Sequence, residues 1–146
     1  MSRQKKTVLL GLLLAANLLF IWGNSALPAS ASAELSGGLL AMLGWVGAIA
    51  EKILRKLAHF SEFACLGVLL CLLFRTRGSR SLTTPLLCGI LAAMVDETIQ
   101  LAVPGRSSAV IDVWIDTLGV ASGVAAALFV LRLIQRHYLK SGGNET

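Results

Sequence analysis

The sequence predicts an all-α, polytopic membrane protein: a small four-helix transmembrane bundle with an additional interfacial helix on the outer side. Of its 146 residues, 55% are hydrophobic and 14% are charged, whereas a typical soluble domain has about a quarter of its residues charged. The chain contains four apolar runs close to the roughly 20 residues that a helix needs to cross a bilayer. Because these runs leave no room for a large soluble unit, we expect a single membrane domain over 1–146.

The four predicted spans are approximately 7–26, 57–74, 82–103 and 110–133. Each is long enough, or nearly so, to cross the membrane as an α-helix. The first run has a second interpretation, because a basic start, an apolar stretch and the small residues of "ALPASASAEL" also describe a cleavable signal peptide. Its apolar stretch is long for a signal peptide, which favours a retained span. The orientation of the other three spans is the same under both interpretations.

The segment 27–56, between the first two spans, is predicted to be an outer loop that contains an interfacial helix. Its apolar residues between 39 and 54 follow helical spacing, and Lys52, Arg55 and Lys56 lie toward its end. This pattern is typical of a helix lying in the membrane surface. Trp45 suits the same level, because tryptophan is enriched at membrane interfaces.

The basic residues indicate how the chain is oriented. Nine of the thirteen lysines and arginines precede the first span, join the second to the third, or follow the fourth: Arg3, Lys5, Lys6, Arg75, Arg77, Arg80, Arg132, Arg136 and Lys140. The positive-inside rule makes this side cytoplasmic. We therefore expect a multi-pass protein of the cell membrane with both termini in the cytoplasm.

Three of the predicted spans carry polar residues toward their outer ends. Counting about 1.5 Å of rise per residue from the cytoplasmic loops places His59, Glu62, Glu97 and Asp116 at similar heights. Residues three or four apart share a helix face, as Asp112 and Asp116 do. Because charges that face lipid are costly, these polar stripes should face one another or a water-filled pocket.

The link between the third and fourth spans, "LAVPGRSSAVIDVW", is predicted to be a tight hairpin. The Pro-Gly pair ends one helix, and Ser107 or Ser108 caps the next. Arg106 is then left beside the polar stripes, where it either pairs with Asp112 or forms a seat for an anion near the helix-start N–H groups.

Small residues in the fourth span form overlapping small-xxx-small patterns: Gly119, Ser122, Gly123 and Ala126. Such patterns allow two helix backbones to approach closely in a membrane. We expect this face of the fourth span to pack against another helix of the bundle.

At its polar residues the chain resembles the VanZ-like family of membrane proteins, which is associated with glycopeptide (teicoplanin) resistance. The resemblance covers about 20–125 and rests on "FIWGNSALPASASAELS", "LRKLAHFSEFACLG" and "VDETIQLAVPGRSSAVIDVWIDTLG". The combination K-x-x-H-F-x-E/Y, D/E-E-x-x-Q, P-G-R and D-x-x-x-N/D-T-x-G is specific, although each piece alone is weak. Glu62 stands where many members have Tyr, and Asp116 where many have Asn. The resemblance implies a four-helix protein of the cell envelope and favours retention of the first span.

Two classes of function are open at this point, and the sequence does not decide whether the protein is an enzyme. In the first class, a membrane enzyme acts on an anionic envelope or lipid-linked substrate, and His59 and Glu97 transfer protons. Six further residues would hold that substrate: Lys56, Glu62, Gln100, Arg106, Asp112 and Asp116. In the second class, the same side chains form a binding pocket or an ion-pair network that only holds the helices together.

Five carboxylates are expected near one another: Glu62, Asp96, Glu97, Asp112 and Asp116. Basic neighbours can neutralise them, so no cofactor is predicted. The alternative is a divalent cation bound by these oxygens together with His59. The expected partners are the lipid bilayer and an anionic envelope or lipid-linked ligand. Nucleic acid is excluded, because the basic residues occur without a recognition motif, and the oligomeric state is left open.

Overall fold

The computed structural model describes residues 1–42, 47–106 and 109–141 of the chain. They form five α-helices: α1 Arg3–Ser25, α2 Ala29–Met42, α3 Ala48–Thr76, α4 Thr83–Leu101 and α5 Val110–Ser141. No strand occurs in these three stretches. The predicted all-α class is therefore confirmed.

Four of the helices, α1, α3, α4 and α5, are long and apolar enough to cross a membrane. The shortest of them, α4, has 19 residues, which at 1.5 Å per residue gives roughly 28 Å and nearly matches the hydrocarbon core. The chain is therefore a multi-pass membrane protein. No proline or glycine occurs between 48 and 66, so α3 continues unbroken from Ala48 through the predicted second span.

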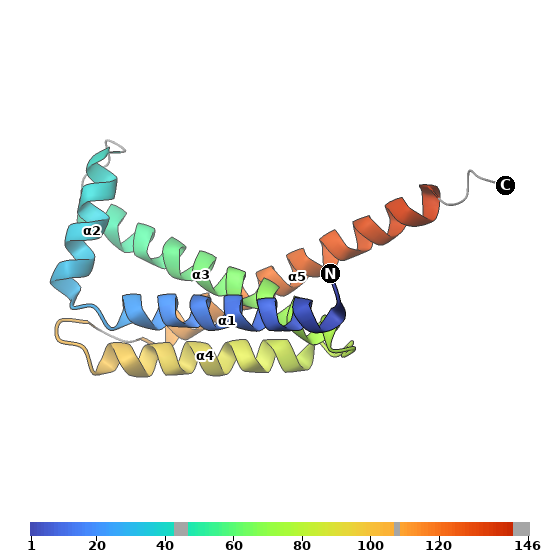
Figure 1. Ribbon diagram of the computed structural model, residues 1–146. Helices are drawn as coiled ribbons and strands as arrows, with labels where there is room; N and C mark the ends of the chain where they lie inside the picture. The colour runs from blue at the N-terminus through green and yellow to red at the C-terminus, as the bar shows by residue number, and fades with distance from the viewer. Residues whose placement is uncertain (43–46, 107–108, 142–146) are drawn as a thin grey trace.

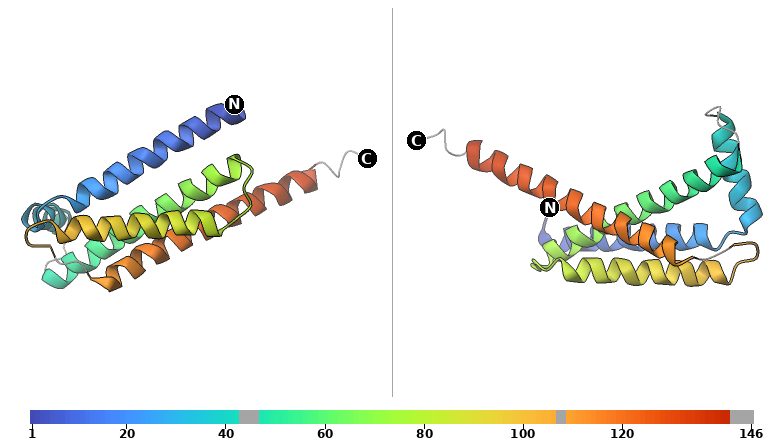
Figure 2. Two further views of the ribbon diagram at one scale, coloured as in Figure 1. Left: turned by 90° about the horizontal axis from the view of Figure 1, so that it is seen from below. Right: turned by 180° about the vertical axis from the view of Figure 1, so that it is seen from behind.

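The helices form a bundle in which α3 and α5 cross, and α1 and α4 lie beside them (Figure 1). Views from below and from behind show the same crossing (Figure 2). The turn near Arg106 lies at the end of the bundle where α1 and α4 end and α3 and α5 begin. We call this the Arg106 end. The opposite end, called the Arg77 end, contains the N-terminus and the turn between α3 and α4.

Close backbone contact defines the crossing of α3 and α5. A Cβ atom on Gly123 would meet the carbonyl oxygen of Ala64, and one on Gly119 would lie 2.5 Å from the carbonyl oxygen of Phe60. In the other direction, a Cβ on Gly67 would meet the carbonyl oxygen of Val120. Only glycine permits backbones to approach this closely. The expected packing role of Gly119 and Gly123 is therefore confirmed.

The same helix corrects part of the small-residue prediction. Ser122 and Ala126 are exposed, so they do not belong to the α3 contact. The buried apolar partners at the crossing are Phe63, Val120 and Val124. Helical geometry explains the difference, because positions 120, 123, 124 and 127 lie on one face of α5, and 122 and 126 lie beside it.

Helix α2 stands steeply inclined to α1 and α4 at the Arg106 end (Figure 1). The structure differs from the expected outer segment in one respect. Lys52, Arg55 and Lys56 belong to α3 rather than to a separate interfacial helix. Trp45, Ser107 and Ser108, for which interfacial and capping roles are predicted, lie outside the described residues.

Candidate functional site

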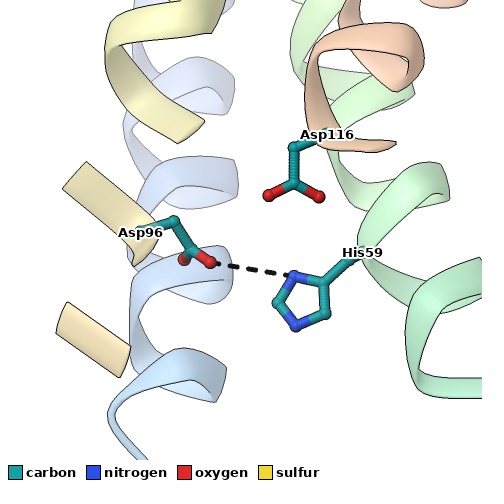
Figure 3. Close-up of side chains that lie close together, drawn as sticks. All are labelled: His59, Asp96 and Asp116. Carbon is teal, nitrogen blue, oxygen red and sulfur yellow. Dashed lines mark ion pairs between the residues drawn. The ribbon is translucent and has the colours of Figure 1, made fainter. Parts of the chain in front are cut away.

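Polar side chains from three helices meet toward the Arg106 end of the bundle. His59 of α3 directs its Nδ1 toward Asp96 of α4, with 3.8 Å between Nδ1 and Oδ2. Asp116 of α5 points toward both of them (Figure 3). One donor atom from each of the three residues lies within 4.8 Å of the others. The Asp96 side chain is fully buried, and Asp116 is 2% exposed.

On α4, Gln100 forms hydrogen bonds that hold Asp96 and Glu97 in place beside His59 and Asp116. The Gln100 side-chain amide donates to Asp96 Oδ2 at 2.8 Å and to Glu97 Oε1 at 3.3 Å. The backbone N–H of Ala109 donates to Glu97 Oε2 at 3.2 Å. Both Glu97 oxygens therefore accept hydrogen bonds, and the carboxylate ties α4 to the residue that precedes α5. The geometry gives Glu97 a positioning role.

Asp112 pairs with Lys56 and not with Arg106. Lys56 Nζ lies 2.7 Å from Asp112 Oδ1, whereas Arg106 makes its contacts elsewhere. Of the two alternatives for Arg106, the pairing with Asp112 is therefore wrong. Position 56 faces α5 from the neighbouring helix, and the direction of an Arg side chain in a turn cannot be inferred from chain spacing.

Replacing Lys56 with methionine is expected to lower the free energy of unfolding by less than about 1 kcal/mol. The pair is partly exposed, with 49% of the Lys56 side chain and 29% of the Asp112 side chain accessible, and exposed ion pairs are worth little. Chemical unfolding of the purified protein in detergent measures the change. A loss of several kcal/mol would mean that the pair is a buried structural contact.

Arg106 holds the turn that follows α4 against the end of α1. Its Nε donates to the backbone carbonyl of Leu27 at 2.8 Å, and its Nη2 donates to that of Asn24 at 2.8 Å. Gly105, at φ 78°, supplies the left-handed backbone conformation that precedes it. Burial lowers the pKa of Arg106, and the positive charge of Arg55 lowers it further. The guanidinium stays charged, because its ordinary pKa is far above neutrality.

Glu62 forms a second contact between α1 and α3. The Asn24 side-chain amide donates to Glu62 Oε1 at 3.1 Å. The other carboxylate oxygen of Glu62 is buried and has no hydrogen-bond partner among the described residues. Glu62 therefore links α3 to the end of α1.

Two adjoining pockets open at this end of the bundle. The first, here called the polar pocket, has a volume of about 360 Å³ and lies between α3, α4 and α5. The second, here called the mixed pocket, has a volume of about 370 Å³ and lies between α1, α2 and α3. Arg55 and His59 line both pockets. The two cavities therefore share part of their walls, at Arg55 and His59 of α3.

The predicted site residues divide between these pockets. Six of them line the polar pocket: Lys56, His59, Glu97, Gln100, Asp112 and Asp116. Glu62 and Arg106 line the mixed pocket, which His59 also borders. The expectation of a single pocket that includes Arg106 is therefore corrected to two pockets joined at Arg55 and His59.

Two residues of the site, Arg55 and Asn24, were absent from the predicted functional side chains, and Asp96 was expected only as one of five neighbouring carboxylates. Asp96 is central, and its position four residues before Gln100 on the same helix face was an available signal. Arg55 precedes His59 by four residues and shares its face in the same way. Nothing in the sequence pointed to Asn24 except that it is a polar residue at the end of an apolar run.

The sequence model of the VanZ/LLP1 family matches residues 5–132, so the chain belongs to this family. The match includes every residue that lines the two pockets, and it confirms the resemblance found in the sequence. No curated protein and no solved structure matches the chain.

Proposed function

We propose that this member of the VanZ/LLP1 family binds the anionic headgroup of a lipid-linked molecule of the cell envelope. The headgroup occupies the polar pocket beside Arg55, and the lipid chain enters the mixed pocket. The observation that carries the proposal is Arg55, which lines both pockets and whose Nε is buried without a hydrogen-bond partner among the described residues. A buried donor of this kind is costly unless a ligand satisfies it.

The basic residues nearest Arg55 favour an anion at its side of the polar pocket. Three carboxylates line the rest of that pocket: Glu97, Asp112 and Asp116. Lys52 lines the polar pocket with it, and Arg106 lies across the mixed pocket. The effect of Arg55 on the pKa of Arg106 means that the two guanidinium groups repel each other. An anion between these cations would relieve that repulsion, and the planar fork of arginine suits phosphate or carboxylate.

The mixed pocket favours a ligand that also has an apolar part. Four apolar side chains from α1, the following turn and α3 contribute to its lining: Phe20, Leu27, Leu54 and Ala58. Three of them belong to helices that cross the membrane, Phe20 to α1 and Leu54 and Ala58 to α3. A soluble ion, by contrast, would need only the polar pocket. An amphiphile with an anionic headgroup fits the two joined cavities better than a free anion does.

The distribution of basic residues supports a site on the outer side of the cell membrane. Nine of the thirteen lysines and arginines lie at the start of α1, at or beside the turn between α3 and α4, or in the last part of α5, so they gather toward the Arg77 end together with the N-terminus. The positive-inside rule then places that end in the cytoplasm and the two pockets at the outer leaflet. The family resemblance implies an association with glycopeptide (teicoplanin) resistance. We propose that binding an envelope lipid at the outer leaflet is the basis of that association.

The proposal assigns binding and gives Glu97 a positioning role, because each of its two carboxylate oxygens accepts a hydrogen bond, and the one from Ala109 ties α4 to the residue that precedes α5. The competing assignment is a network that only packs helices. A packing network would not distinguish ligands, so a binding measurement separates the two assignments.

The experiment titrates dihexanoyl phosphatidic acid into the purified protein in detergent and follows binding by microscale thermophoresis. We expect Arg55→Gln to weaken binding about tenfold or more, since a hydrogen bond to a charged group is worth about 1.5–3 kcal/mol. Arg80→Gln is the matched control, because Arg80 is exposed at the Arg77 end. It should bind as the unaltered protein does.

Two further ligands complete the design. Dihexanoyl phosphatidylcholine has the same chains without a net negative charge, and inorganic phosphate has the charge without chains. Equal binding of phosphatidylcholine would refute the anionic headgroup, and equal binding of inorganic phosphate would refute the lipid part. Failure of phosphatidic acid to bind would leave the packing network as the explanation of the site.

A further inference from the structure

We infer that His59, Asp96 and Asp116 form a binding site for one divalent transition-metal ion of the Zn²⁺ or Mn²⁺ type at the floor of the polar pocket. This inference goes beyond headgroup binding, because it concerns other residues. The three ligands come one each from α3, α4 and α5, and His59 lies further along α3 from the Arg106 end than Arg55 and Lys52 do. His59 and Asp116 line the pocket, and Asp96 lies across from His59 with the Asp116 carboxylate pointing toward both (Figure 3).

The geometry brings three donor atoms within reach of one ion. One donor from each residue lies within 4.8 Å of the other two, and His59 Nδ1 lies 3.8 Å from Asp96 Oδ2. Zinc bonds to nitrogen and oxygen are about 2.0–2.2 Å long, which places neighbouring ligand atoms about 3–3.5 Å apart. A small inward movement of the side chains would therefore complete the coordination.

The three side chains are also incompletely satisfied. Asp96 Oδ1, Asp116 Oδ2 and His59 Nδ1 are buried and have no hydrogen-bond partner in the described part of the chain. Asp96 is fully buried and Asp116 is 2% exposed. Two buried carboxylates facing each other require a cation or shared protons. Lys56 does not meet this need, because its Nζ contacts Asp112.

The chemistry of the donors selects the type of ion. An imidazole nitrogen with two carboxylate oxygens suits Zn²⁺ or Mn²⁺, whereas Mg²⁺ and Ca²⁺ prefer oxygen ligands alone. Water from the polar pocket can supply the remaining ligands. Gln100 holds Asp96 by donating to its Oδ2 at 2.8 Å, as outer residues that orient metal ligands commonly do.

The test measures metal content without any lipid. The full-length protein in detergent is stripped with EDTA and equilibrated with ZnCl₂ or, separately, MnCl₂. Bound metal is then counted by inductively coupled plasma mass spectrometry. We expect about one ion per chain and a rise in the unfolding temperature, because an ion that binds only the folded state stabilises it. His59→Gln and Asp116→Asn should each weaken binding at least about tenfold and abolish the rise.

Two variants serve as controls. Asp112→Asn removes a carboxylate one turn from Asp116 on the same helix, and Arg55→Gln removes the proposed headgroup contact. Both should retain the metal. Retention by Arg55→Gln with loss of phosphatidic acid binding would separate this inference from the proposed function.

The inference is overturned if the unaltered protein binds no more metal than His59→Gln, which leaves a proton shared by the two aspartates as the explanation. It is also overturned if Asp112→Asn loses the metal and Asp116→Asn keeps it, because the site would then lie elsewhere. His59 is partly accessible, with 15% of its side chain exposed. The His59→Gln comparison therefore remains informative if Asp116→Asn fails to fold.

Discussion

Replacing Gly123 with alanine is expected to lower the free energy of unfolding by at least about 3 kcal/mol. The new Cβ would meet the carbonyl oxygen of Ala64 and lie 3.0 Å from the backbone nitrogen of Val68. These atoms belong to the main chain of α3, so no side-chain rotation can make room. Overpacking usually costs about 1–3 kcal/mol, and the rigid neighbours place this site at or above the upper end. Chemical unfolding in detergent measures the loss.

Gly11→Ala is the matched control for this substitution. Gly11 also lies inside a membrane-spanning helix, and its added Cβ would have nothing within 4 Å. Alanine favours a helix over glycine by about 1 kcal/mol, so Gly11→Ala should leave stability unchanged or raise it. Similar losses for both variants would show that helix propensity, and not the α3–α5 crossing, determines the result.

The crossing also governs the site, because it sets how α3 and α5 are rotated against each other. Gly119 and Gly123 lie on the same side of α5 as Asp116, which is three residues before Gly119. A shift at the crossing would therefore move Asp116 relative to His59. For this reason we expect Gly123→Ala to reduce metal binding as well as stability.

Much of the fold could be predicted because it depends on local properties of the chain. Four apolar runs of sufficient length predict four spans, and glycines at positions 119 and 123 predict a close helix contact. The meeting of polar residues followed from helical rise alone, since it required only that His59, Glu97 and Asp116 lie at similar depths. None of these inferences needs knowledge of which helices are neighbours.

The details that failed all depend on neighbours. Arg106 was the candidate for pairing with Asp112, but the rotation of α3 against α5 puts Lys56 there instead. Asp96 gained its central position because the face of α4 containing residues 96 and 100 turns toward His59. Helix α3 begins at Ala48, whereas helical spacing and the basic residues before 57 had placed that segment in a separate helix at the membrane surface.

Arg106→Lys is expected to lower the free energy of unfolding by about 2–3 kcal/mol, although it keeps the positive charge. The guanidinium donates to two backbone carbonyls, that of Asn24 in the last turn of α1 and that of Leu27 just after it. A lysine has one nitrogen and cannot reproduce this fork, and a hydrogen bond to a charged donor is worth about 1.5–3 kcal/mol. Chemical unfolding in detergent measures the loss, with Arg80→Lys at the Arg77 end as the control.

The same variant separates the two roles that the sequence allows for Arg106. If Arg106 chiefly fastens the turn after α4 to the end of α1, then Arg106→Lys should speed amide hydrogen exchange in 24–29 and leave phosphatidic acid binding within about twofold. If Arg106 chiefly grips the headgroup, binding should fall while exchange stays slow. The two short bonds to backbone carbonyls occupy Nε and Nη2, so the first outcome is expected. Arg55, whose Nε has no partner in the described chain, is then the arginine free to meet a ligand.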